Sequence, residues 1–285
     1  MNHLTHSSHL SRFTVLQFVD ADFFTFFQFG IAKSRNSCTI MTNKVTIFVC
    51  FLNLLFSVNH GFTPMHRGSS RFFLDTADVA EWEALLPTGI FHGVTTNPTL
   101  LKRANEPCTI ENLHRLARKA LELSDEFMCQ AWGHDLYECG MQLSAPARDR
   151  ITIKVPVTIK GVTAASQLIQ SGCRVCLTAC YNHKQALLAA SVGAEYLAPY
   201  LGRMTDAGLD GRHECCYMNN IVKGMNSDTR ILVASLRDAE SLADLAANCN
   251  MDTFTFSPAV ARELFVDALT DEAAVVFETD AQEAG

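Results

Sequence analysis

From residue 72 onward, short apolar segments alternate with segments of helical periodicity, and this alternation limits the fold more than any other feature. Eight segments are strand-like: 72–76, 94–97, 127–132, 151–157, 175–181, 196–201, 231–235 and 254–257. Helical spacing of apolar residues occurs at 111–124, 163–170, 183–191, 239–247 and 259–268. Strands alternating with helices predict βαβ units around a parallel sheet. Eight such units predict a closed (β/α)8 barrel, the TIM barrel, as one α/β domain.

A doubly wound open sheet is the competing architecture. Its nucleotide-binding forms carry a G-x-G-x-x-G or G-x-x-x-x-G-K-[ST] motif after the first strand, and neither motif follows residue 76 here. The hydrophobic content of 48% suffices for one large core. The net charge of −7 argues against a nucleic-acid partner, which usually requires a basic face. Phosphate-bearing small molecules remain compatible with this charge, because a few local arginines suffice to bind them.

Polar residues stand at or near the end of every strand-like segment. They are Asp75, Asn97, Gln130, Lys154, Thr178, Tyr200, Ser235 and Ser257. In a barrel these ends converge on the C-terminal mouth, where catalytic residues come from several strands. Each residue alone has a simpler explanation, since Asp75 or Asn97 could cap a helix. Their recurrence at corresponding places predicts an active site at this mouth.

Lys154 is the most informative of these residues because it interrupts an apolar strand. In segment 151–158, a period of two places the isoleucines and valines on one face and Lys154 with two threonines on the other. Lysine is rarely buried without a partner or a task. Burial lowers the pKa of an ammonium, and only the neutral amine attacks a carbonyl to form a Schiff base. An edge strand with a solvated lysine is the simpler alternative.

Residues 1–67 are predicted to form a disordered leader outside the barrel domain, which we place at residues 68–285. Residues 41–44 and the apolar stretch 45–58 are typical of a secretory signal segment. This stretch is too short for a membrane-spanning helix of about 20 residues. Met41 is a candidate start, which would make residues 1–40 an upstream misreading. The leader resembles the two-part leaders of algae with secondary plastids, which predicts a plastid or similar organelle; the cytoplasm is the alternative.

The 11 cysteines are predicted to be buried free thiols. Strand parity sends Cys173 and Cys176, a C-x-x-C pair, to opposite faces, and adjacent Cys215 and Cys216 are poorly placed to hold one metal. No second C-x-x-C and no H-x-x-x-H occurs at structural-zinc spacing. Free thiols favour a reducing compartment. We therefore expect no metal and no other cofactor.

Several motifs of the barrel region resemble one family. They are LDT at 74–76, GVTTNP at 93–98, KVPVT at 154–158, APY at 198–200 and AS at 234–235. In order and spacing they are similar to the small-subunit transaldolase and fructose-6-phosphate aldolase family. The resemblance runs from residue 71 to the C-terminus and does not include the leader. It implies a metal-free, class I mechanism on a (β/α)8 barrel with sugar phosphates as substrates.

The resemblance also implies catalytic roles. Lys154 matches the Schiff-base lysine that attacks the C2 ketone of a ketose phosphate, and Asp75 matches the carboxylate that handles the substrate hydroxyl proton. Thr178 and Gln130 match the pair that holds the water of imine formation and hydrolysis. Tyr200 matches a phenol that can act as acid or base.

The same matching implies a set of substrate-binding residues. Asn97 and Thr95 correspond to residues that hydrogen-bond the three-carbon dihydroxyacetone unit. Arg203 and Ser235 correspond to the phosphate-binding pair, for which a guanidinium fork and a hydroxyl are well suited.

Two positions separate lyases from transferases in this family. Transferases usually carry Glu at the water-holding position and Phe near the end of the sixth strand, whereas lyases that release free dihydroxyacetone carry Gln and Tyr. Gln130 and Tyr200 therefore predict a lyase similar to fructose-6-phosphate aldolase, with a transaldolase of the pentose phosphate pathway as the alternative. The loops at 132–135 and 206–212 depart from the family pattern and could alter the choice of acceptor.

Two functions outside this family are also open for the barrel. In a different phosphate-binding barrel, such as an isomerase or decarboxylase, Lys154 would bind charge instead of carbon. A non-catalytic barrel retained for binding or assembly is the other possibility.

Small members of the family form rings that pair into decamers, so we expect a homo-oligomer in which the helix at 267–277 packs on a neighbour. An eighth helix packed on its own barrel is the alternative for that segment.

Overall fold

The computed structural model of the protein describes residues 29–34, 37–42 and 70–285. The chain divides into two compact units, Met1–Asn59 and His60–Gly285. In the first unit, β1 (Phe29–Ser34) and β2 (Ser37–Thr42) pair antiparallel, with Phe29 opposite Thr42. The rest of the predicted leader 1–67, apart from these two strands, lies outside the described residues, as does its apolar stretch 45–58. Its role in targeting stays a prediction.

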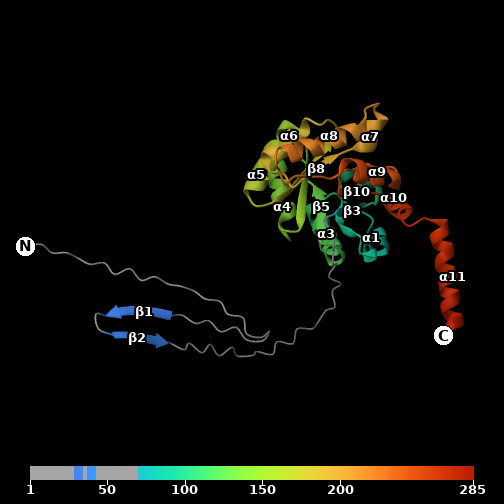
Figure 1. Ribbon diagram of the computed structural model, residues 1–285. Coiled ribbons are helices and arrows are strands. Elements are labelled where there is room, and N and C mark those ends of the chain that lie inside the picture. The colour runs from blue at the N-terminus through green and yellow to red at the C-terminus, as the bar shows by residue number, and fades with distance from the viewer. Residues whose placement is uncertain (1–28, 35–36, 43–69) are drawn as a thin grey trace, which may run out of the picture. The chain divides into compact units, whose positions relative to one another are not determined.

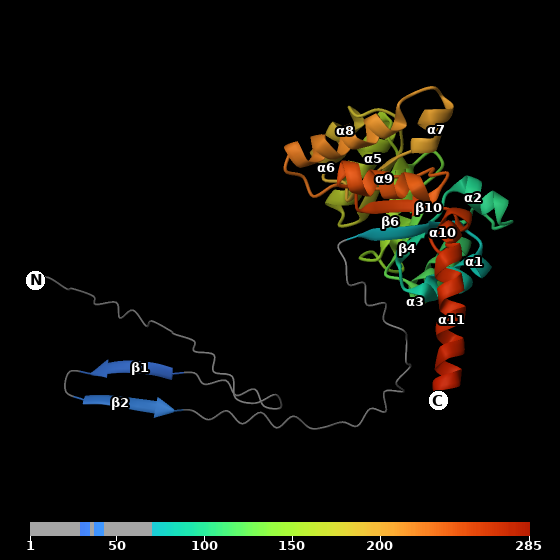
Figure 2. The ribbon, with the colours of Figure 1, turned by 45° about the vertical axis from the view of Figure 1, so that its right-hand side comes forward.

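The second unit is a barrel of eight parallel strands (Figure 1, Figure 2). The strands are β3 (Arg71–Asp75), β4 (Phe91–Thr95), β5 (Glu126–Gln130), β6 (Ile151–Pro156), β7 (Arg174–Cys180), β8 (Tyr196–Pro199), β9 (Arg230–Ile231) and β10 (Thr253–Phe256). Each strand pairs with the next along the chain up to β9, and β10 pairs with β3. Val233 closes the remaining gap by bridging to Phe254, with Thr255 N donating to Val233 O at 2.9 Å. The predicted TIM barrel is confirmed.

Helices follow the strands and surround the barrel (Figure 1). They are α1 (Val79–Leu85), α2 (Pro98–Arg103), α3 (Ile110–Leu123), α4 (Leu136–Ser144), α5 (Ile159–Gln170), α6 (Gln185–Val192), α7 (Leu201–Asp206), α8 (Gly211–Gly224), α9 (Ala239–Cys249), α10 (Pro258–Glu263) and α11 (Ala268–Ala284), with a 3-10 turn at Leu86–Thr88. Most begin at an Asp, Asn, Ser or Thr whose side chain accepts a backbone N–H of the first turn, which satisfies an otherwise unpaired donor. Across the described ranges, no helix is both long and apolar enough to cross a membrane.

Helices α1, α2, α4, α7 and α8 have no counterpart among the predicted helical segments, and two other elements differ from the sequence-based expectation. Strand β9 has only two residues, because the chain after Ile231 leaves regular pairing and closes the barrel by the single bridge at Val233. Helix α8 was not predicted; it begins where Asp210 accepts the His213 amide at 2.9 Å. The segment 259–268, predicted as one helix, contains α10 apart from its first residue and only the first residue of α11.

Two layers of apolar side chains make up the core. The outer layer lies between strands and helices and includes Ile151, Ile153 and Val155, the face of β6 predicted to be apolar. The smaller inner cluster consists of Phe73, Met128, Cys176, Tyr196, Ala198 and Leu232, on or beside the strands. Burying one large aliphatic side chain contributes about 1.5–3 kcal/mol. The alternation on β6 therefore holds the strand in one register and keeps Lys154 on the inner face.

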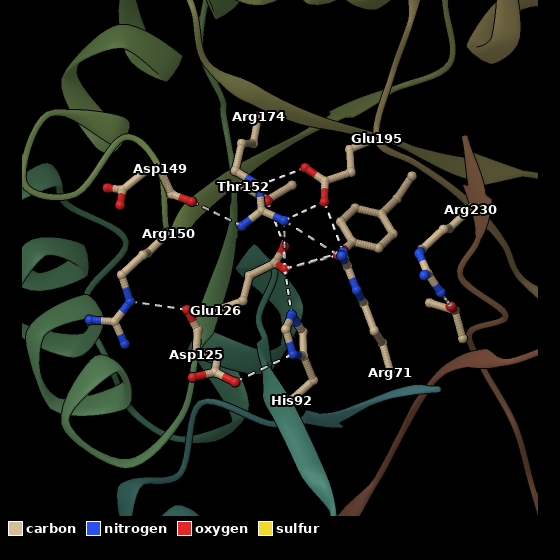
Figure 3. A network of polar contacts seen from close by, with 12 residues as sticks. Arg71, His92, Asp125, Glu126, Asp149, Arg150, Thr152, Arg174, Glu195 and Arg230 are labelled. Atoms are coloured by element: carbon tan, nitrogen blue, oxygen red, sulfur yellow. Dashed lines mark hydrogen bonds and ion pairs between the residues drawn. The ribbon is translucent and has the colours of Figure 1, made fainter. Parts of the chain in front are cut away.

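A polar network occupies the end of the barrel where the strands begin (Figure 3). Glu126 is fully buried, and its Oε2 accepts hydrogen bonds from Arg174 at 2.8 Å and from the Tyr196 hydroxyl at 2.9 Å. Glu195 in turn pairs with both Arg174 and Arg71. Removing one partner of such a buried pair costs about 3–5 kcal/mol, because it leaves the other charge uncompensated. This end of a barrel serves stability, and the opposite end serves chemistry.

The cysteine predictions have two outcomes. Cys173 and Cys176 are free and lie in different core layers, as strand parity predicts. Cys216 on α8 and Cys249 on α9 form a disulfide across a Cα–Cα distance of 5.2 Å. The expectation of free thiols is therefore wrong for this pair. The two cysteines are 33 residues apart and meet only because the two helices pack side by side.

Helix α11 stands apart from the barrel (Figure 1, Figure 2). Within the described residues, none of its side chains is buried, and Leu269 is 76% and Phe277 69% exposed. The alternative in which this helix packs on its own barrel is therefore not what the structure shows.

Candidate active site

A cavity of about 440 Å³ opens at the C-terminal ends of the barrel strands. Six of the nine predicted site residues line it: Asp75, Asn97, Lys154, Tyr200, Arg203 and Ser235. Thr95 and Thr178 are hydrogen-bonded to lining residues. Gln130 does not line the cavity, although it pairs with Lys154 across β5 and β6. The structure thus brings together residues from seven of the eight strands or the segments that directly follow them.

Lys154 lies in the fourth barrel strand with 2% of its surface exposed. Burial is the largest single influence and lowers the pKa of its ammonium, but Tyr200, Asp75, Cys176 and Cys129 together outweigh it, so the pKa lies above its ordinary value. The expectation that the strand environment leaves a neutral amine is therefore wrong in direction. An amine in this setting rests as a cation and must pass its proton on before it can attack a carbonyl.

Asp75, at the end of β3, is held by a pair of threonines. Thr95 Oγ1 on β4 donates to Asp75 Oδ1 at 2.6 Å. Because the Thr95 proton is used there, Thr255 must donate to Thr95, across 2.5 Å. Both threonines are buried. This chain fixes the Asp75 carboxylate at the cavity wall.

Asn97 caps the N-terminus of α2 and also lines the cavity. Its Oδ1 accepts the backbone N–H groups of Thr99 at 2.9 Å and Leu100 at 3.1 Å, and so starts α2. The amide nitrogen takes no part in this cap. The helix-capping explanation offered for Asn97 is thus correct, and it leaves the donor end of the amide for a ligand.

Tyr200 and Thr178 form a pair beside Lys154. Their hydroxyl oxygens are 3.0 Å apart. Thr178 precedes a register shift in β7, where Ala179 adopts a left-handed φ of 58°. This irregularity lies just before the last residue of β7, Cys180, which pairs again with Pro199. Such bulges commonly adjoin active sites, where they aim a side chain.

Arg203 and Ser235 are joined through the backbone that carries them. Leu201 N donates to Ala234 O, and Gly202 N donates to Ser235 O, both at 3.0 Å. A Cβ atom on Gly202 would lie 2.3 Å from Ser235 O, so this approach requires glycine. Ser235 itself has a left-handed φ of 60°. The two predicted phosphate-binding residues are therefore placed by one tight junction.

Ser257, predicted only as a strand-end residue, also lines the cavity, and the unpredicted lining residues include Arg103, Arg237 and Thr255. Arg237 follows Ser235 by two residues and pairs with Asp206 at 2.5 Å. Thr255 lies between two phenylalanines of β10, so the alternation of residues along the strand could have identified it as a candidate site residue. Arg103 ends α2 and has no comparable sequence signal. Four cationic side chains, counting Lys154 and Arg203 with Arg103 and Arg237, make the cavity suited to an anionic ligand.

Clusters of side chains that could bind a metal are the last feature of the site region. Among the described residues, no group of three or more His, Cys, Asp or Glu side chains is placed to hold a metal ion.

A barrel with a buried lysine at its mouth defines a class of enzymes, and comparison with known proteins places the chain within it. A family profile described as Transaldolase/Fructose-6-phosphate aldolase matches residues 111–284. A probable transaldolase of Chelativorans sp. (strain BNC1) is 35% identical over 213 residues, which covers 74% of this chain and 95% of the relative. A probable transaldolase of Hyphomonas neptunium is 34% identical over 215 residues, covering 75% and 98%. The chain belongs to the transaldolase/fructose-6-phosphate aldolase family and is an enzyme of that family.

Proposed function

We propose that the protein performs Schiff-base aldol chemistry on ketose phosphates, with Lys154 as the covalent residue. The observation that carries this proposal is a buried lysine that shares one cavity with Asp75 and Tyr200. The ammonium first passes one proton to a neighbouring base, and the neutral Nζ attacks the C2 ketone to give a carbinolamine. The same proton then returns to the carbinolamine hydroxyl, which leaves as water, and a protonated imine remains. This imine accepts the electron pair of the C3–C4 bond when that bond breaks. Asp75 takes the proton of the C4 hydroxyl, and an aldehyde leaves.

The enamine that remains on Lys154 has two exits. Protonation at C3 followed by hydrolysis releases dihydroxyacetone, and attack on a second aldehyde completes a transfer. Thr178 and Gln130 are the candidates for holding the water of imine formation and hydrolysis, and the hydrogen bond between Thr178 and Tyr200 supports the part of Thr178. Asn97 and Thr95 are the candidates for the hydroxyl groups of the three-carbon unit.

Borohydride trapping tests the covalent step. Reduction in the presence of fructose 6-phosphate should add a stable mass to the peptide that contains Lys154, and Lys154→Ala should lose both adduct and activity. Lys160→Ala is the matched control, because Lys160 is an exposed lysine whose Nζ contacts only the Gly133 carbonyl at 3.4 Å. An adduct on another lysine, or turnover without any adduct, would refute the assignment and favour a barrel in which Lys154 only binds charge.

Release of dihydroxyacetone is the finer part of the proposal and rests on Gln130 and Tyr200. A neutral Gln can position water but cannot move its proton, and a phenol can act as an acid or base. We expect release of free dihydroxyacetone from fructose 6-phosphate without an acceptor. Tyr200→Phe with Gln130→Glu should shift turnover toward transfer to erythrose 4-phosphate.

Transaldolase activity is the alternative, since the family description names both activities and the relatives are named probable transaldolases. If the unmodified protein transfers efficiently yet releases no dihydroxyacetone, it is a transaldolase that moves the three-carbon unit between sugar phosphates.

We also propose that α11 mediates assembly into a homo-oligomer. The helix and the residues before it expose Phe265, Leu269 and Phe277, and no described side chain of α11 is buried within its own chain. An unpartnered face of this kind is typical of an interaction site.

A further inference from the structure

Arg103, the last residue of α2, is a cationic lining residue of the cavity that the proposed mechanism does not use. Its side chain is exposed, and among the residues that the structure describes its guanidinium has no hydrogen-bond or ion-pair partner. The other two lining arginines are engaged: Arg237 pairs with Asp206 at 2.5 Å, and Arg203 lies over the Tyr200 ring. Arg103 is therefore a cation in the cavity that lacks an anion.

The position of Arg103 on α2 assigns it to one end of the substrate. Asn97, Leu100 and Arg103 recur at every third residue and all line the cavity, so one face of α2 runs along the cavity wall from the Asn97 cap. Side chains on a helix lean toward its N-terminus, which brings the stem of Arg103 toward the Asn97 end. Because Asn97 is the candidate for binding the three-carbon unit, Arg103 belongs to that end of the substrate.

The strand order places Arg103 and Arg203 on opposite sides of the mouth. In the closed ring of eight strands, β4 and β8 are four strands apart, and β6 stands midway between them. Arg103 is on the helix that follows β4, Arg203 is on the helix that follows β8, and Lys154 is on β6. A ketose bound with C2 at Lys154 and its terminal phosphate at Arg203 therefore directs its C1 end toward the side of Arg103.

The charge and the size of the cavity suit a ligand with two anionic groups. Four cationic side chains line it against two carboxylates, Asp75 and Asp206, and Asp206 is already paired with Arg237. On a chain with a net charge of −7, such a local excess of positive charge attracts anions. The volume of about 440 Å³ is within the range of about 300–1,000 Å³ that is usual for small-molecule sites. A single phosphate at Arg203 and Ser235 would leave Arg103 without an anion.

We propose that Arg103 forms a second anion subsite, which binds a phosphate on C1 of the three-carbon unit. The substrates then include ketose bisphosphates, with a phosphate at each end, in addition to ketose monophosphates. The covalent chemistry is that of the proposed function, on which this inference rests. The C3–C4 bond breaks, Asp75 takes the C4 hydroxyl proton, and the enamine on Lys154 keeps the C1 phosphate unchanged. The guanidinium fork of an arginine matches the oxygens of such a phosphate.

Kinetics with fructose 1,6-bisphosphate and fructose 6-phosphate test the subsite. Arg103→Ala should raise the KM for the bisphosphate about ten times more than the KM for the 6-phosphate, which corresponds to about 1.4 kcal/mol. Arg103→Lys keeps the charge and should recover most of this difference. Lys102→Ala is the matched control, because Lys102 is the neighbouring exposed cation on α2 and does not line the cavity. It should leave the ratio of the two KM values as it is.

Binding of two unreactive probes distinguishes failure of this inference from failure of the proposed function. Glucitol 1,6-bisphosphate and glucitol 6-phosphate lack a carbonyl, so calorimetry on the full chain measures their affinities without Schiff-base chemistry. The unmodified protein should bind the bisphosphate more tightly, and Arg103→Ala should reduce this advantage about tenfold, whereas Lys102→Ala should keep it.

The outcomes separate the two proposals. If borohydride trapping with fructose 6-phosphate fails while this order of affinities holds, the subsite stands and the proposed function falls. If the unmodified protein shows no preference for the bisphosphate probe, or if Arg103→Ala and Lys102→Ala behave alike, the subsite is refuted whatever the trapping shows.

Discussion

Lys154 is subject to two opposing influences on its charge. Burial disfavours the ammonium, whereas Tyr200 and Asp75, together with Cys176 and Cys129, favour it and set the net upward direction of its pKa. Tyr200 and Asp75 are also the groups that the proposed mechanism uses for proton transfer. At the scale of single residues, one arrangement therefore stabilises a buried charge and prepares it to lose its proton.

Arg203→Ala tests recognition of the phosphate. The KM for fructose 6-phosphate should rise about ten- to a hundredfold, because a charged hydrogen bond contributes about 1.5–3 kcal/mol. Reactions of unphosphorylated dihydroxyacetone and glyceraldehyde should change little. Arg212→Ala is the control, since Arg212 pairs with Asp244 outside the cavity and should leave both KM values as they are. An equal loss with both kinds of substrate would indicate a folding defect instead.

At the scale of elements, the ends of neighbouring strands determine which side chains meet. Asp75 and Thr95 are register partners on β3 and β4, and Gln130 and Lys154 are register partners on β5 and β6. After β8, the chain turns at once into α7, and two backbone hydrogen bonds tie that helix to the residues after β9. Arg203 and Ser235 owe their proximity to this junction.

Gly202→Ala tests the junction. A methyl group 2.3 Å from Ser235 O forces the two backbones apart, so the KM for phosphorylated substrates should rise and the thermal midpoint should fall. Gly224→Ala is the matched control: it ends α8 with open space around the added methyl group. Alanine in place of glycine there should be neutral or stabilise the protein by up to about 1 kcal/mol. Equal behaviour of the two variants would argue against the junction.

From the exposed apolar side chains of α11 we expect the protein to form an oligomer. Light scattering of the full chain at micromolar concentration should give a mass above that of one chain. Val276→Asp with Phe277→Asp should reduce it, because both side chains are more than half exposed in the monomer and become buried on assembly. Glu283→Ala, on the same helix, is the control. A monomer mass for the unmodified protein would end the proposal.

At the scale of the whole molecule, the barrel separates stability from chemistry along its axis. The network of Glu126, Arg174, Glu195 and Arg71 occupies one end, and the cavity with Lys154 opens at the other. The inner apolar cluster consists of residues on or beside the strands that join the two ends. Mutations in the network should therefore change stability more than catalysis.

Glu195 predicts how stability changes with pH. Burial raises the pKa of its carboxyl group, but hydrogen bonds and charge pairing with Arg174 and Arg71 outweigh burial and lower the pKa to about 2. Because this pKa is lower in the folded state, the ionised Glu195 stabilises the protein at pH values above its ordinary pKa of 4.5. This contribution is lost as the pH falls from 4.5 toward 2. The change corresponds to roughly 3 kcal/mol at most.

Denaturant unfolding between pH 2 and 6 measures this contribution. The difference in unfolding free energy between the unmodified protein and Glu195→Gln should shrink as the pH falls. Glu240→Gln, an exposed control, should show no such trend. A difference that stays constant with pH would mean that the charge of Glu195 is not what stabilises this end of the barrel.

The sequence by itself determined the barrel, the inward face of Lys154 and the strand-end residues of the cavity lining. These follow from local periodicity, because parity along a strand and the common direction of parallel strands place all strand ends at one mouth. Tertiary structure alone decided the upward pKa of Lys154, the presence of Arg103 and Arg237 in the cavity, and the Cys216–Cys249 disulfide. It also decided the packing of Tyr181 and Arg203 on the ring of Tyr200. Each of these depends on distances between residues that are remote in sequence, and periodicity carries no information about such distances.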